Sequence, residues 1–165
     1  MGCQPSLNWR VVQLEGTQLS LELPCKPDRT LKTVQMAGQT LELAVAGCEA
    51  DHAVWAVMST TLPSTVNRSE VLKGWRQATL QNMKAYEVLD VNWTPPKMAA
   101  LPGTLRIKAK GTGPEQQAVF SHAVWLTHLE ADSVRLVHLV VYQNKNRAFQ
   151  DEQQTAPFFE SVKLP

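Results

Sequence analysis

The period of the hydrophobic residues changes along this chain, and the change limits the folds that it can adopt. Residues 18–23 alternate strictly between polar and apolar, which is typical of a β-strand with one buried face. From Ser69 to about Glu87 the apolar residues recur at three- and four-residue spacing, which predicts one stripe of a helix. Strand-like alternation returns after residue 104. This order predicts an α+β fold with one long middle helix.

Short turn signals divide the strand-rich parts into two meanders. Ala37-Gly38-Gln39 lies between two apolar-alternating runs, which predicts a tight hairpin. A run from Val134 to Tyr142 is nearly all β-branched or apolar, so we expect a central strand that is buried on both faces. The sheet is predicted to be curved and antiparallel. The strands are expected at residues 9–14, 18–23, 30–36, 40–46, 53–58, 104–110, 116–128 and 134–142.

The ends of the two helices carry their own signals. Asn67 with Glu70 three residues later predicts a capped helix start. A short C-terminal helix is expected to begin with Thr155 as its cap and Pro157 in its first turn. The polar face of the middle helix is interpreted as a solvated surface without a site. Its residues are Lys73, Arg76, Gln77, Gln81 and Lys84.

Bulk composition predicts one globular domain over residues 9–165, preceded by a short polar tether at residues 1–8. The chain is 44% hydrophobic and has a formal net charge of +1, so it lacks the single-sign field of a nucleic-acid-binding protein. No apolar run approaches the roughly 20 residues that cross a bilayer. We therefore expect membrane attachment only through a lipid, and no cofactor.

Cys3 directly follows Gly2, as the lipid-accepting cysteine does at the cleavage site of a bacterial lipoprotein precursor. Met1 would then be a start methionine that replaces a removed signal peptide. We expect Cys3 to be the lipidation site. The alternative is a cytosolic protein whose third residue happens to be cysteine.

Cys25 and Cys48 are the two remaining cysteines, and each lies at the end of a predicted strand. In an oxidising compartment the pair is free to form one disulfide. In the cytosolic alternative both would be buried thiols. The close spacing of a redox-active pair is absent.

Two histidines are weak candidates for a metal site. If the turn after Leu129 pairs Leu126 with Val134, then His122 falls opposite His138 on one face of the sheet. A register slip of one residue would separate them. We expect no metal, and we interpret the histidines as ordinary residues of a sheet face.

Residues 90–102 contain three prolines and are predicted to form the longest loop. Irregular loops on a rigid scaffold commonly carry recognition. We therefore expect a binding surface at Trp93, Met98 and Leu101.

The two ends of the chain resemble the PsbP and DcrB-like proteins. The start, an aromatic residue followed by a strand that ends in Leu23-Pro24, is similar to theirs. The end is also similar, because Val141-Tyr142 precedes a segment at residues 156–164 that resembles their "Phe-Phe-x-Ser-Phe" helix, here with Phe158 and Phe159. The placement of Cys25 and Cys48 also resembles small proteobacterial lipoproteins. The resemblance implies a fold whose members are mostly non-catalytic, and it carries over no functional residues.

Three hypotheses of function follow. The first is a non-catalytic lipoprotein of the bacterial cell envelope, on the periplasmic side, which binds an envelope protein or a small apolar ligand. The second is a cytosolic chaperone or adaptor of the same fold that shields a secreted effector. The third is a metal or redox enzyme, for which the sequence has no catalytic motif.

Overall fold

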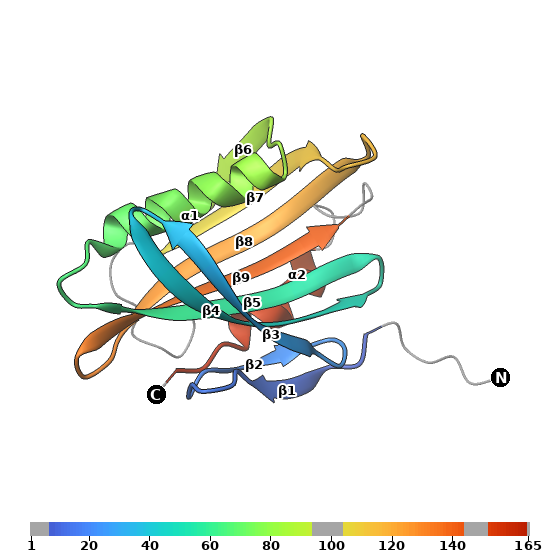
Figure 1. The fold of residues 1–165 in the computed structure, drawn as a ribbon. Coiled ribbons are helices and arrows are strands. Elements are labelled where there is room, and N and C mark those ends of the chain that lie inside the picture. The colour runs from blue at the N-terminus through green and yellow to red at the C-terminus, as the bar shows by residue number, and fades with distance from the viewer. Residues whose placement is uncertain (1–6, 94–103, 144–151, 165) are drawn as a thin grey trace.

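The computed structural model describes residues 7–93, 104–143 and 152–164. Within these ranges two antiparallel sheets account for most of the structure, and each sheet is continuous (Figure 1). The elements are β1 (Arg10–Gln13), β2 (Ser20–Leu23), β3 (Asp28–Met36), β4 (Gln39–Ala50), β5 (Ala53–Pro63), α1 (Arg68–Asn82), β6 (Glu87–Asp90), β7 (Leu105–Thr112), β8 (Ala118–Leu129), β9 (Ser133–Gln143) and α2 (Glu152–Glu160).

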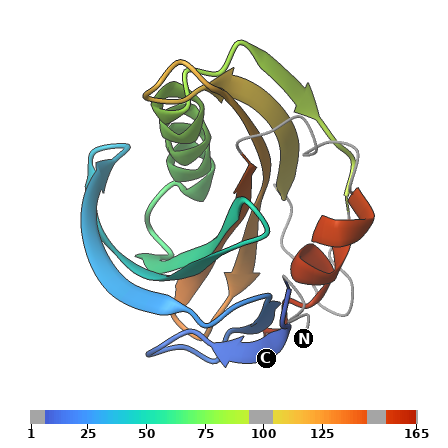
Figure 2. The ribbon, with the colours of Figure 1, turned by 90° about the vertical axis from the view of Figure 1, so that its right-hand side faces the viewer.

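The larger sheet has seven strands in the order β3-β4-β5-β9-β8-β7-β6. All its neighbouring strands are antiparallel, as the sequence predicted. Figure 2 shows the sheet curving around α1, with α2 on its opposite face. The hairpin between β3 and β4 turns at Ala37 and Gly38, which both have positive φ, the backbone that a two-residue hairpin loop requires.

Two hydrophobic cores lie on the two faces of this sheet. One is formed where β1, β2 and α2 cover the convex face, and it includes the fully buried Trp55, Phe158 and Phe159. The other is formed where α1 covers the concave face, and it includes Trp75 and Trp125. Because β8 and β9 have a core on each side, their residues are buried almost without interruption, as predicted for the run from Val134 to Tyr142.

The prediction of a long middle helix is wrong. The helix α1 begins where expected, with the Asn67 side chain accepting hydrogen bonds from the amides of Ser69 and Glu70. It ends at Asn82, about one turn earlier than expected, and the chain then forms strand β6. The observed fold is mostly antiparallel sheet with two short helices, so the sheet rather than a helix organises the molecule.

The early end of α1 has a local cause at Lys84. This residue adopts a left-handed φ of 47°, its amide donates to the Gln81 carbonyl, and the Ala85 amide donates to the Leu80 carbonyl. These are the two closing bonds of a Schellman motif, which normally has glycine at the position of Lys84. The chain lacks that glycine, so the sequence did not reveal the stop.

The C-terminal helix also begins earlier than predicted. It starts at Glu152, so Thr155 and Pro157 lie inside α2 rather than at its cap and first turn. The side chains of Phe158, Phe159 and Val162 are nevertheless buried, as expected.

Candidate functional site

A disulfide joins Cys25 to Cys48, which confirms the sequence prediction of a bonded pair. Cys25 lies just after β2, and Cys48 lies in β4, with 5.9 Å between their Cα atoms. The bond therefore fastens the small β1-β2 sheet to the larger sheet. Cys48 is 8% exposed and belongs to the core of the convex face.

Trp93 packs partly buried against the core of the convex face. The Arg106 guanidinium carbon lies 5.8 Å from the centre of the Trp93 ring and 5.2 Å from that of Phe159. Burial lowers the pKa of Arg106, and the nearby Glu160 acts in the opposite direction. Met98, Leu101 and the expected lipidation site Cys3 lie outside the described residues, so the predicted binding surface is described at Trp93 alone.

The histidine pair does not form. The register pairs Leu126 with Val137 and Leu129 with Val134, so the predicted pairing of Leu126 with Val134 is wrong by three residues. His138 instead lies opposite Trp125 on the concave face. His122 is three residues before Trp125 on the same strand, and it therefore points to the convex face. Within the described residues, no three His, Cys, Asp or Glu side chains group as metal ligands do.

His138 is fully buried between two tryptophans. Its ring stacks on Trp125 with 4.5 Å between centroids and lies 5.3 Å from the Trp75 ring. Nδ1 donates to the Val124 carbonyl at 3.1 Å, so Nε2 carries no proton in the neutral ring, and it has no hydrogen-bond partner among the described residues. Burial lowers the pKa of His138 to about 4, and the bond to Val124 opposes this shift. The ring is neutral near pH 7 and belongs to the core.

The outer face of α1 forms an open groove, which is the candidate functional site. Val71, Leu72 and Trp75 turn inward, so residues on the flank of the helix remain accessible. The groove has a volume of about 420 Å³. It is lined by Lys73, Arg76, Gln77, Leu80, Gln81, Lys84 and Ala85.

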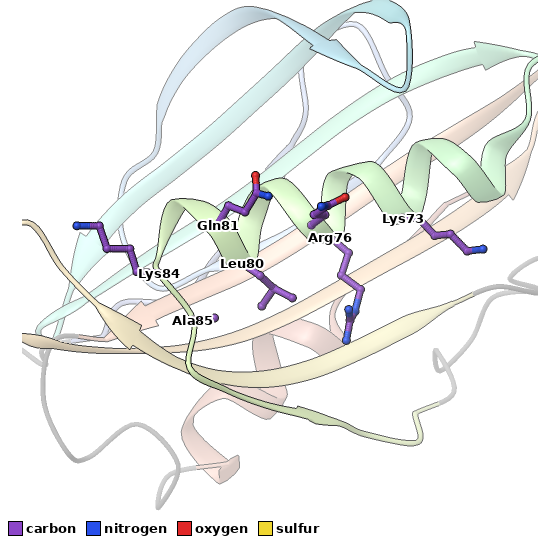
Figure 3. A pocket seen from close by; sticks show the side chains of 7 residues that line it. Lys73, Arg76, Leu80, Gln81, Lys84 and Ala85 are labelled. Carbon is purple, nitrogen blue, oxygen red and sulfur yellow. The ribbon is translucent and has the colours of Figure 1, made fainter.

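The groove lies on the flank of α1 from which Arg76 reaches β6. Figure 3 shows Arg76 and Leu80 pointing from α1 toward that strand, with Lys73 and Lys84 at the two ends. The Arg76 guanidinium bonds the Asp90 carboxylate of β6 at 3.2 Å across this space. Because Lys84 ends the helix in a left-handed conformation, the chain turns back and carries β6 along the same flank.

The chemistry of the groove suits a polar, negatively charged ligand. Three cations and two amides surround a small apolar floor formed by Leu80 and Ala85. A small apolar ligand would leave Lys73 and Lys84 without an acidic partner among the described residues, whereas carboxylates or phosphates would pair with them. Sequence reasoning assigned this face to solvent, because the pattern of a solvated helix and that of a basic groove are the same. The signal that distinguishes them is the strand directly after the helix.

Neither helix in the described ranges combines the length and the apolar character needed to span a bilayer.

Comparison with known proteins shows the fold and no family. No protein-family model matches the chain, and no curated protein matches it in sequence. The chain is similar in structure to LpqN of Mycobacterium tuberculosis, described as involved in cell envelope biogenesis, with a TM-score of 0.55 and 8% identity over 95% of this chain and 91% of that one. PA94 of Pseudomonas aeruginosa, a protein of unknown function, aligns at a TM-score of 0.38 and 10% identity over 90% of each chain. The likeness to LpqN fits the expected PsbP/DcrB-like fold only loosely.

Proposed function

We propose that this chain is a non-catalytic binding module of the bacterial cell envelope, tethered by a lipid on Cys3 and acting through a protein partner. The observation that carries the proposal is the disulfide between Cys25 and Cys48. Stable disulfides are typical of the periplasm and other oxidising compartments and are rare in the cytosol. The bond therefore favours the envelope over a cytosolic chaperone.

Two further observations support this function. LpqN, which shares the fold, is described as involved in cell envelope biogenesis. The groove on α1 is open and carries cations and amides, which suits binding of a polar surface better than enclosure of a small apolar ligand. The first point favours the envelope, and the second favours a protein partner.

The test is the intact mass of the full chain purified from its native cells without reductant. A lipid-sized addition at the N-terminus together with two missing hydrogens is expected. A Cys3→Ser variant expressed with its natural leader should lose the addition and leave the membrane fraction, while keeping the disulfide. An unmodified and fully reduced chain in the cytosolic fraction would overturn the proposal.

A further inference from the structure

The strand β6 presents an open edge. It is the last strand of the seven-stranded sheet, and among the described residues only β7 pairs with it. All four of its residues are exposed. An open edge of this kind offers backbone donors and acceptors to another strand.

The register of β6 shows which groups are available at this edge. The Val91 amide donates to the Arg106 carbonyl at 2.8 Å, and bonded and non-bonded residues alternate along an antiparallel pair. Glu87 and Leu89 therefore turn their backbone toward β7. Val88 and Asp90 turn theirs toward the open edge, where an added strand would find them.

The open edge and the basic groove lie on the same side of the sheet. Val88 pairs with Ala109 and Asp90 with Ile107, and both partners belong to the concave core beneath α1. The ion pair between Asp90 and Arg76 confirms that this face of β6 looks toward the helix. A strand added beyond β6 would therefore project every second side chain toward the groove.

The charges of the groove specify those side chains. Lys73 and Lys84 form no ion pair with any described residue, and Arg76 has only the largely exposed Asp90. Lys73 lies in α1 and Lys84 lies just beyond its end at Asn82, and the helix alone spans roughly 14 Å between Lys73 and that end. An extended segment covers that length in about five residues, so carboxylates at alternate positions reach the cations along the whole groove.

We propose that β6 and the basic groove bind an extended acidic segment of a partner protein, which adds a strand beyond β6 and turns acidic residues at alternate positions into the groove. This inference rests on the proposed function, since it names the class of partner. A second copy fits less well. The β6 strand of a second copy would turn only Val88 and Asp90 toward this face, so it would bring one carboxylate instead of several, and that carboxylate already pairs with Arg76 of its own copy.

The first experiment measures binding of three fluorescein-labelled peptides to the full chain by anisotropy. The probes are a peptide of alternating Asp and Val, an isomer of the same composition with its Asp residues in one block, and the alternating peptide with N-methylated backbone amides. Saturable binding of the alternating peptide is expected, at least about tenfold tighter than of either control. The absence of saturable binding, or equal binding of all three, would overturn the proposal.

The second experiment reverses charge inside and outside the groove. Lys73→Glu/Lys84→Glu should weaken binding of the alternating peptide about tenfold. Lys32→Glu/Arg68→Glu changes the net charge equally but lies outside the groove, and it should leave binding within about twofold. If both variants lose the same amount of binding, the peptide responds to the net charge of the whole protein, and the proposed site is refuted. A dimer of the full chain that Val88→Pro abolishes would assign the edge to a second copy and also refute it. Lipid on Cys3 is measured separately, so failure here leaves the envelope function standing.

Discussion

Protonation of the buried His138 should destabilise the fold in mild acid. The ring is fully buried between Trp75 and Trp125, and burial lowers its pKa from 6.5 to about 4. The unfolded chain therefore binds a proton at a higher pH than the folded chain does. The contribution of His138 to the free energy of unfolding is complete above about pH 6.5 and is lost progressively as the pH falls toward 4.

The size of the effect follows from the shift. At about 1.4 kcal/mol per pKa unit, the loss is about 2 kcal/mol at pH 5 and about 3 kcal/mol at pH 4. That loss is a large fraction of the stability of an ordinary domain. The carboxylates of the chain also titrate in this range, so the effect of His138 is isolated by comparison with variants.

The assay is urea unfolding, followed by tryptophan fluorescence, between about pH 7 and about pH 4. His138→Gln keeps a donor for the Val124 carbonyl, and His138→Phe keeps a ring between the tryptophans. In the wild type, the free energy of unfolding falls between pH 7 and pH 5, and His138 should account for about 2 kcal/mol of that fall. In both variants the fall should be smaller by this amount, whatever their stability at neutral pH. His52→Gln, at an exposed turn, should keep the wild-type profile. If the His138 variants follow the wild-type pH profile, the reasoning is refuted.

Three further predictions concern stability. Cys25→Ser/Cys48→Ser should lower the free energy of unfolding by about 3 kcal/mol, because the disulfide joins residues 23 positions apart. If the variant differs from the wild type no more without reductant than with it, the prediction is contradicted. Gly111→Ala should lower the melting temperature markedly, since a Cβ there would lie 2.0 Å from the Met83 carbonyl oxygen, whereas Gly74→Ala in α1 should add about 0.5–1 kcal/mol; similar effects at both sites in thermal melts would refute the close approach. Asn67→Ala should cost about 1 kcal/mol in urea unfolding, and an unchanged midpoint would show that the cap is not needed.

Features encoded locally could be predicted from the sequence. The turn at Ala37 and Gly38 and the cap at Asn67 depend on residues within a few positions of one another, and both appear where expected. The end of α1 could not be predicted, because Lys84 occupies a left-handed position that statistics reserve for glycine. The strand β6 was not predicted, since the expected helix reached its first residue, Glu87, and the expected loop began at its last, Asp90.

The candidate site depended on tertiary arrangement and was therefore not predictable. The register of β8 against β9 decides where His122 and His138 point. The predicted register was wrong by three residues, so the two histidines point to opposite faces of the sheet. Lys73, Arg76 and Lys84 show no more than a polar helix face in the sequence. They line a groove on the flank of α1, and the reversal of the chain after the helix brings Asp90 beside Arg76.

The place of β9 in the sheet also sets the order in which this chain can fold. β5 is followed in sequence by α1 but pairs with β9, with partners as distant as Ala53 and Gln143. The hairpins β3-β4-β5 and β7-β8-β9 are local, so each can form early, while the seam between β5 and β9 must close a long loop and is expected to form late and slowly. Cys25 and Cys48 both belong to the first half of the chain. Their oxidation can therefore be complete before β5 pairs with β9, and the bond does not shorten the loop that connects these two strands.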